Sequence, residues 1–340
     1  MRIEWERIRA ETADPFTTSR STNTEIERVW VRIVHGDVEG WGEADPSRYY
    51  GESAGTVEAA LAEMRPAVEE ADGPEPMQAL ERELDRRIGA NRAAKAAVVA
   101  ALLDLRGKSL GEPLWRLWGL DPEEAPLSSF TVGMDDPEAV AEKIDRAPDY
   151  PVLKVKLGGD RDEEILAAVR HAAPDRRIRV DANAAWSAKE ALWKIRTLAD
   201  HGVEFVEQPL PPEDREGLRL VRERSPLPVI LDESCRTAAD VPELVGLADG
   251  VNIKLAKCGG PLEALRAIHA ARACGLQVMM GCMLETSLGI APAAHLAPLL
   301  DHADLDGAAL LGDDPFRGPG IGDDGRIRVS EEPGLGIERA

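Results

Sequence analysis

The chain has 340 residues and a formal net charge of −21 at pH 7, with 62 acidic and 41 basic side chains. This excess of negative charge argues against a nucleic-acid partner, because binding a phosphate backbone depends on clustered cations. The sequence has no basic amphipathic helix, no apolar run of about 18 residues and no apolar core in its charged first residues, so we expect no membrane partner and a soluble, cytoplasmic protein. The four cysteines form no CxxC pair, which favours a reducing compartment.

The first third of the chain predicts a small α+β domain. Strand-like runs at Arg28–Val34 and Gly40–Ala44 are typical of an antiparallel meander. Helical patterns follow at Thr56–Glu70, Met77–Ile88 and Asn91–Lys108. The last of these is rich in alanine and apolar nearly all round, as a buried helix should be. Strands followed by helices therefore indicate one α+β domain over residues 1–118.

From about Leu127 short apolar strands alternate with helical stretches. We expect strands at Leu127–Val132, Val152–Leu157, Ile178–Ala182, Phe205–Gln208, Val229–Asp232, Gly250–Leu255, Gln277–Gly281 and Ala303–Asp306. Eight such units, without a nucleotide-type glycine-rich loop after the first, favour a modified TIM (β/α) barrel over an open sheet. We assign residues 119–320 to this α/β barrel. Residues 321–340 are expected to return to the N-terminal domain, with Gly325–Val329 pairing there as a strand.

Charged residues stand at the ends of the second to the sixth expected strand. Because the C-terminal ends of barrel strands open onto one face, these side chains should meet there. Asp181, Glu207 and Asp232, each about one βα unit from the next, predict the ligands of one Mg²⁺ ion, which prefers oxygen donors. Lys156 and Lys254 belong to strands that are opposite in a ring of eight. A substrate carbon between them can lose a proton to one side and regain it from the other.

This set of residues suits the removal of a proton next to a carboxylate. Such a proton is weakly acidic, because its loss adds negative charge to an anionic group, and a divalent metal stabilises the resulting enediolate. A nearby cation also makes a lysine a better base. Lys154 shares a strand face with Lys156, and we expect it to hold the carboxylate or to lower the proton affinity of its neighbour.

These motifs resemble those of the enolase superfamily, in its muconate lactonizing enzyme subgroup, over essentially the whole chain. The matched pattern is Lys154-x-Lys156, Asp181-x-Asn183, Glu207-Gln208-Pro209, Asp232-Glu233-Ser234 and Asn252-x-Lys254. The resemblance implies an α+β capping domain over the barrel, one Mg²⁺ per subunit on the three carboxylates, and Lys156 and Lys254 as the acid/base pair. Asn183 and Asn252 are expected to support the ligands. The mandelate racemase subgroup fits less well, because no His-x-Asp stands at the seventh strand.

Within the subgroup the chain is most similar to the dipeptide epimerases, of which the L-Ala-D/L-Glu epimerases are the best-known type. The similarity lies in Gly281–Gly289, which includes Cys282 and Leu284, and in Asp304-Leu305-Asp306. In that family the Asp-x-Asp pair binds the free ammonium of the dipeptide, and two carboxylates two residues apart on a strand share a face. We expect Cys282 and Leu284 beside the substrate. Arg20 matches the position of an arginine that binds an acidic side chain.

The leading hypothesis is therefore a Mg²⁺-dependent isomerase, a dipeptide epimerase that moves the α-proton of the C-terminal residue through an enediolate. L-Ala-D/L-Glu and related dipeptides are candidate substrates. An o-succinylbenzoate synthase and an N-succinylamino acid racemase of the same subgroup stay open, although the former has no evident need for Asp304-x-Asp306. A non-catalytic ligand-binding relative is the alternative from another class, and the intact lysine pair argues against it. We expect a small dipeptide as partner and a homo-oligomer as the assembly.

Overall fold

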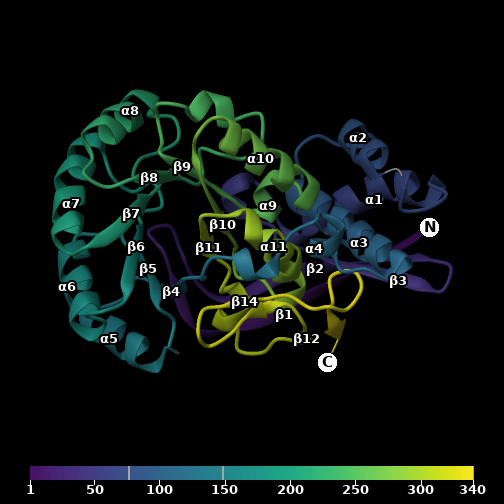
Figure 1. Ribbon diagram of the computed structural model, residues 1–340, viewed down its shortest axis with the longest axis horizontal. Coiled ribbons are helices and arrows are strands. Elements are labelled where there is room, and N and C mark those ends of the chain that lie inside the picture. The colour runs from purple at the N-terminus through teal and green to yellow at the C-terminus, as the bar shows by residue number, and fades with distance from the viewer. Residues whose placement is uncertain (76, 148, 340) are drawn as a thin grey trace.

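The computed structural model describes residues 1–75, 77–147 and 149–339, and combines an antiparallel cap with a parallel barrel (Figure 1). The fold class predicted from the sequence is confirmed. In Figure 1 the cap lies on the right and the outer helices of the barrel curve along the left edge. Within the described ranges no helix combines the length and the apolar character needed to cross a membrane.

The cap is a three-stranded antiparallel sheet, in the order β1-β2-β3, packed against helices. Its elements are β1 (Arg2–Thr17), β2 (Thr22–His35), β3 (Val38–Ala44), α1 (Ala54–Glu70), α2 (Met77–Arg87), α3 (Arg92–Leu110) and α4 (Leu114–Leu117). Strand β3 lies directly against α3, because a Cβ at Gly40 would stand 2.0 Å from the carbonyl oxygen of Ala101 and one at Gly42 2.2 Å from that of Ala97. Any larger residue at these two positions would push the sheet away from the helix.

The barrel consists of eight parallel strands in the spatial order β4 to β11. They are β4 (Phe130–Val132), β5 (Val152–Lys156), β6 (Arg177–Asp181), β7 (Val203–Glu207), β8 (Val229–Leu231), β9 (Gly250–Ile253), β10 (Gln277–Gly281) and β11 (His302–Asp304). A parallel bridge between Ser128 and Ala303 joins the first strand to the last and closes the ring. All eight predicted strands are present, although several end one or two residues earlier than predicted.

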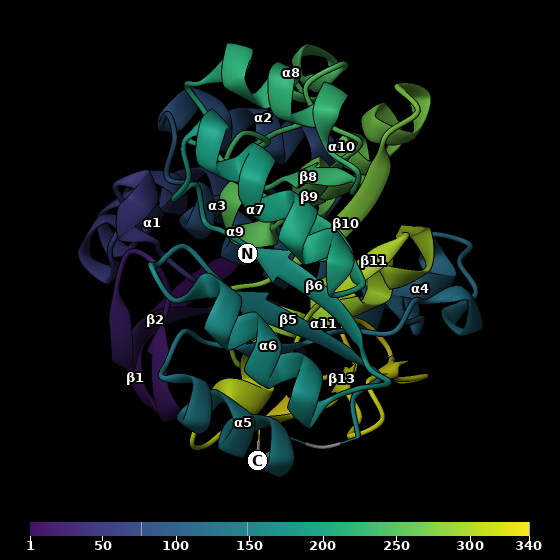
Figure 2. The same cartoon turned by 90° about the vertical axis from the view of Figure 1, so that its left-hand side faces the viewer.

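Helices cover the outside of the barrel. They are α5 (Pro137–Arg146), α6 (Asp162–Ala172), α7 (Ala188–Asp200), α8 (Arg215–Arg224), α10 (Pro261–Ala273) and α11 (Ser287–Leu296). The short helix α9 (Leu255–Cys258) packs against α3 of the cap. Figure 2 shows α5 to α8 side by side on the face of the barrel that is turned toward the viewer. After β8 a short 3₁₀ helix, Val241–Leu244, replaces the usual α-helix, so the barrel is a modified one.

The C-terminal residues contact the cap, but through other residues than predicted. The predicted pairing of Gly325–Val329 with the N-terminal domain is wrong, since β14 (Ile327–Arg328) pairs with β13 (Gly320–Ile321). Closing this short hairpin costs less chain entropy than a distant pairing. Within residues 321–340 the cap is contacted by Leu335, whose amide donates to Asp104 Oδ1 (2.8 Å), and by Ile337, and both side chains belong to the apolar core of the cap. Just before this segment, the Phe316 ring packs edge-on against Trp30 at 4.9 Å. Phe316 lies in β12 (Phe316–Arg317), which pairs with β15 (Glu338–Arg339).

His295 connects three parts of the chain. Its buried ring on α11 accepts a hydrogen bond at Nδ1 from the Trp115 amide (3.3 Å), and its Nε2 lies 3.1 Å from the Leu335 carbonyl oxygen. These contacts suit a neutral ring with its proton on Nε2. Burial lowers the pKa of His295 to about 4.

We expect acid to destabilise the fold through this ring. The folded pKa lies below the unfolded value of about 6.5, so the unfolded state takes up a proton first as the pH falls. The contribution of the neutral His295 ring to the free energy of unfolding is complete above pH 6.5 and decreases by about 3 kcal/mol as the pH falls toward 4. In urea unfolding, His295→Gln should therefore lose stability less steeply than the wild type over this window. Equal pH dependences in the two proteins would contradict the assignment.

Candidate active site

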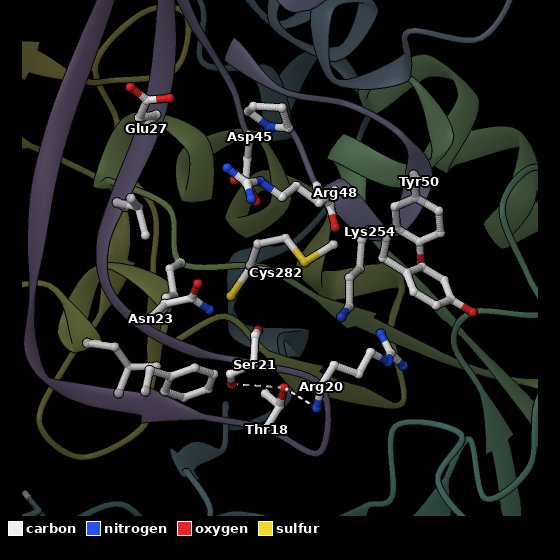
Figure 3. Close-up of a pocket in the computed structure, with 18 of the residues that line it drawn as sticks. Thr18, Arg20, Ser21, Asn23, Glu27, Asp45, Arg48, Tyr50, Lys254 and Cys282 are labelled. Atoms are coloured by element: carbon white, nitrogen blue, oxygen red, sulfur yellow. Dashed lines mark hydrogen bonds between the residues drawn. The ribbon is translucent and has the colours of Figure 1, made fainter.

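A cavity of about 1070 Å³ lies between the cap and the C-terminal ends of the barrel strands (Figure 3). Three groups of residues line it, namely the turn between β1 and β2, the cap loop that precedes α1, and the ends of the barrel strands. Five of the charged strand-end residues predicted from the sequence line this cavity, namely Lys156, Asp232, Lys254, Asp304 and Asp306. The other three are buried next to them: Asp181 contacts Lys156, Lys154 contacts Asp304, and Glu207 contacts Lys154. The barrel positions the site, and the cap covers it.

The three predicted metal-binding carboxylates lie on neighbouring strands. Asp181 ends β6, Glu207 ends β7, and Asp232 follows β8 by one residue. The strand register pairs Asp181 with Glu207 directly, and all three side chains are buried. Burial and the charge of Asp181 raise the pKa of Glu207 to about 6. Carboxylates gathered in this way require nearby cations, because buried like charges are costly.

Lys154 supplies one of these cations. Its Nζ lies 2.7 Å from Glu207 Oε2, 3.2 Å from Asp181 Oδ2 and 2.8 Å from Asp304 Oδ2. The contact with Glu207 is an ion pair outside hydrogen-bond geometry, so the buried Oε2 has no hydrogen bond. In the described part of the chain, no three acidic, imidazole or thiol groups already converge as a complete ligand set. The oxygen-only donors, and the Glu207 oxygen that has an ion pair but no hydrogen bond, nevertheless fit a magnesium ion.

Lys156 and Lys254 come from opposite sides of the ring. Lys156 ends β5 and Lys254 follows β9, four strands further round the eight-stranded barrel. Lys156 Nζ lies 2.6 Å from Asp181 Oδ2, and Lys254 Nζ lies 2.8 Å from Asp232 Oδ2. Burial disfavours the charge on Lys254, but Asp232 overcomes this effect and holds the pKa of Lys254 above its ordinary value. Both lysines line the cavity, so the two amines flank it.

The two predicted asparagines support the carboxylates. The backbone amide of Asn183 donates to Asp181 Oδ1 (2.8 Å), and the side-chain Nδ2 of Asn252 donates to Glu207 Oε1 (2.8 Å). Asn183 has a φ of 44°, in the left-handed region that residues with side chains seldom adopt. These hydrogen bonds orient the carboxylates, as the outer contacts of metal ligands generally do.

Lys257 was missed by the sequence analysis. Its buried Nζ lies 2.6 Å from Asp232 Oδ1, 2.6 Å from the Asp232 carbonyl oxygen and 2.7 Å from that of Asn252. Lys254 and Lys257 thus hold the two carboxylate oxygens of Asp232, one each. The sequence did hold a signal for this lysine. Lys257 lies in the first turn after β9 among small and apolar residues, a setting that favours burial and so calls for an acidic partner.

Asp304 and Asp306 converge, although not on one strand as predicted. Asp304 ends β11, whereas Asp306 lies past it at the start of a short 3₁₀ helix, because the chain turns at Leu305. Both carboxylates meet at Thr131. Its amide donates to Asp306 Oδ2 (2.5 Å), and its hydroxyl lies 3.2 Å from Asp304 Oδ1 and 3.3 Å from Asp306 Oδ1. Burial and the charge of Asp304 raise the pKa of Asp306 to about 7.

The remaining predicted residues, Arg20, Cys282 and Leu284, also line the cavity. The carbonyl oxygen of Leu284 accepts a hydrogen bond from Arg28 Nε (2.8 Å), which fixes the segment after β10 against the cap. The guanidinium of Arg20 is engaged by protein groups, since it forms an ion pair with Glu233. A pairing between residues 213 positions apart left no local signal in the sequence.

Family models cover both parts of the chain. The mandelate racemase/muconate lactonizing enzyme N-terminal domain matches residues 3–119, and the enolase C-terminal domain-like family matches residues 137–339. The protein therefore belongs to the enolase superfamily, in the muconate lactonizing enzyme subgroup, and the resemblance drawn from its motifs is confirmed.

Relatives in this family include dipeptide epimerases. The chain is 39% identical to the L-Ala-D/L-Glu epimerase of Bacteroides thetaiotaomicron, over 95% of this chain and 84% of the relative. A substrate-liganded L-Ala-D/L-Glu epimerase from Bacillus subtilis has a TM-score of 0.94 at 34% identity, covering 100% of this chain and 99% of that one. The dipeptide epimerase of Enterococcus faecalis, solved with Mg and L-Leu-L-Tyr, has a TM-score of 0.93 at 32% identity, covering 99% of both chains.

Proposed function

We propose that this protein is a Mg²⁺-dependent dipeptide epimerase that moves the α-proton of the C-terminal residue. The observation that carries the proposal is the placement of Lys156 and Lys254 on opposite strands of a cavity that also contains Asp304 and Asp306. Relatives named as dipeptide epimerases, one of them solved with Mg and a dipeptide, support both the reaction and the metal.

Asp181, Glu207 and Asp232 are the residues that would hold the ion. When bound, Mg²⁺ supplies positive charge beside the substrate carboxylate and so lowers the cost of removing the neighbouring α-proton. Lys154, which contacts two of these three ligands, adds a further positive charge on the same side of the cavity.

The two lysines divide the proton transfer between them. For one epimer Lys156 accepts the α-proton, and Lys254, as an ammonium, returns a proton to the opposite face of the carbon. For the other epimer the two roles are exchanged. Both amines are largely buried, which limits the access of water to the carbon while it lacks its proton.

Asp304 and Asp306 bind the N-terminal ammonium of the dipeptide. Two buried carboxylates that share Thr131 form a compact anionic site, and an ammonium is attracted to it strongly where water is excluded. Lys154 touches both Asp304 and Glu207, so the ammonium site and the metal ligands keep a fixed separation. Cys282 and Leu284 lie on the wall of the same cavity and contact the body of the substrate.

The experiment that tests this function is a dipeptide library incubated with enzyme and Mg²⁺ in D₂O and read by mass spectrometry. We expect one deuterium at the α-carbon of the C-terminal residue, in acidic or in apolar dipeptides, and none in the presence of EDTA. N-succinyl amino acids and the o-succinylbenzoate precursor are the matched competitors. Exchange confined to N-succinyl amino acids would indicate a racemase, and turnover confined to the o-succinylbenzoate precursor would indicate the synthase; either result would contradict the proposal.

Lys257 provides a further test of the metal site. Lys257→Met removes the cation that holds one oxygen of Asp232, so Mg²⁺ affinity should fall by about 10- to 100-fold, as is typical when support of a ligand is lost. Calorimetric titration with Mg²⁺ measures this directly, and thermal unfolding shows whether the variant is folded. The control is Lys189→Met, at an exposed lysine on α7. Unchanged affinity in folded Lys257→Met would show that Asp232 needs no such support.

A further inference from the structure

The turn between β1 and β2 places Arg20 over the mouth of the barrel. The Thr18 amide donates to the Ser21 carbonyl oxygen (2.9 Å), and the Arg20 amide donates to Thr18 Oγ1 (3.2 Å). Figure 3 shows Arg20 extending from this turn toward the side of the pocket where Lys254 and Tyr50 lie. The tight turn thus presents one guanidinium from the cap to the barrel loops.

That guanidinium contacts two barrel loops at once. Arg20 Nη2 donates to the Asn183 carbonyl oxygen (2.9 Å) and also forms a hydrogen-bonded ion pair with Glu233 Oε1. Asn183 lies two residues after Asp181, and Glu233 directly follows Asp232. Because Asn183 is in the left-handed conformation, its peptide is held in place by such contacts rather than by its own preference.

Arg20 is the cation that faces the buried Glu233 carboxylate. The Glu233 side chain is only 1% exposed, and among the described residues Arg20 is its one ion-pair partner. The second oxygen, Oε2, is buried without a hydrogen bond, and Asn183 Nδ2 approaches the first at 3.4 Å. A buried carboxylate deprived of its cation is strongly unfavourable, so the pair fixes the loop that carries Asp232.

A second cap loop joins the same contact through aromatic rings. The Arg20 guanidinium carbon lies 4.2 Å from the centre of the Tyr49 ring, and the Tyr49 and Tyr50 rings meet edge-to-face at 4.9 Å. On the far side, the Arg236 guanidinium carbon lies 5.0 Å from the centre of the Tyr50 ring. This stack links residues 48–50 of the cap to the barrel segment that follows Asp232.

From these contacts we infer that Arg20 is a positioning residue. It fastens two cap loops to the barrel loops that follow Asp181 and Asp232, and it does not bind an acidic substrate side chain. The inference rests on the proposed function for the role of those two aspartates as metal ligands. If the inference is correct, loss of Arg20 weakens both metal binding and the attachment of the two cap loops to the barrel. Both effects are independent of the side chain of the dipeptide.

The test compares Arg20→Met and Arg20→Lys with Arg82→Met, which removes an exposed arginine from helix α2 of the cap. We expect Arg20→Met to lower Mg²⁺ affinity, measured by calorimetry, by about 10- to 100-fold. Amide hydrogen exchange should rise at residues 18–22 and 47–51. Deuterium incorporation should fall by the same factor for L-Ala-L-Glu and L-Ala-L-Leu, with partial recovery in Arg20→Lys.

The opposite pattern would overturn the inference. If Arg20→Met keeps the Mg²⁺ affinity and the amide protection of the wild type but loses activity on L-Ala-L-Glu alone, Arg20 binds the acidic side chain. The metal and exchange measurements use no substrate, so they decide the role of Arg20 even if the wild type acts on neither dipeptide. Inactivity of the wild type on both dipeptides would count against the proposed function and not against the positioning role of Arg20.

Discussion

Lys156→Ala and Lys254→Ala are each expected to lower the rate of epimerisation by a factor of about 10²–10⁴, the usual contribution of a general acid or base. Each lysine reaches the cavity from its own side of the barrel, so neither can replace the other. Circular dichroism or chiral chromatography of the dipeptide measures this loss. Lys143→Ala, at a lysine that pairs with Asp135 on the outside of the barrel, is the control.

The two variants should differ in what they retain. With one lysine left, the enzyme can still remove and return the α-proton of the epimer whose proton faces that lysine. In D₂O, proton NMR should therefore show exchange of one epimer in Lys156→Ala and of the other in Lys254→Ala, without interconversion. Exchange of the same epimer in both variants would place the two lysines on one side of the substrate.

Asp306→Asn is expected to weaken dipeptide binding by at least about 2 kcal/mol, or roughly 30-fold in KM, because it removes a carboxylate that the bound ammonium holds in its charged form. Asp306 is a better choice than Asp304, since Asp304 also holds Lys154. Steady-state kinetics on L-Ala-L-Glu and on its N-acetyl derivative, which has no ammonium, measure the effect in matched substrates.

The matched substrates separate a lost charge from a damaged site. The wild type should strongly prefer the free dipeptide, and Asp306→Asn should lose most of that preference while its weak activity on the N-acetyl derivative stays unchanged. If the variant loses activity on both substrates in the same proportion, Asp306 supports the structure of the cavity and does not bind the ammonium.

Much of the fold follows from local patterns. The βα alternation predicted the eight strands, and the spacing of about one βα unit brought Lys156, Asp181 and Glu207 to neighbouring strand ends, where the register pairs them. Geometry that repeats along the chain can be inferred without coordinates, because each strand end opens onto the same face.

Contacts between distant segments could not be predicted in this way. The Arg20–Glu233 pair and the three hydrogen bonds of Lys257 depend on how loops from different units fold over one another. Asp306 left its predicted strand because the chain turns one residue after Asp304, and Gly325–Val329 formed a local hairpin in place of a long-range one. In each case a lone polar residue or a short extended run suited several partners equally well.

The central claim is that the α-carbon of a dipeptide lies between Lys156 and Lys254. The most direct measurement is the first turnover of a single epimer by the wild type in D₂O with Mg²⁺, with product and remaining substrate analysed separately. Two lysines on opposite faces predict product that carries deuterium at the α-carbon while the remaining substrate still carries mostly hydrogen. Product that keeps the hydrogen of the substrate, or no product from any dipeptide, would contradict the account.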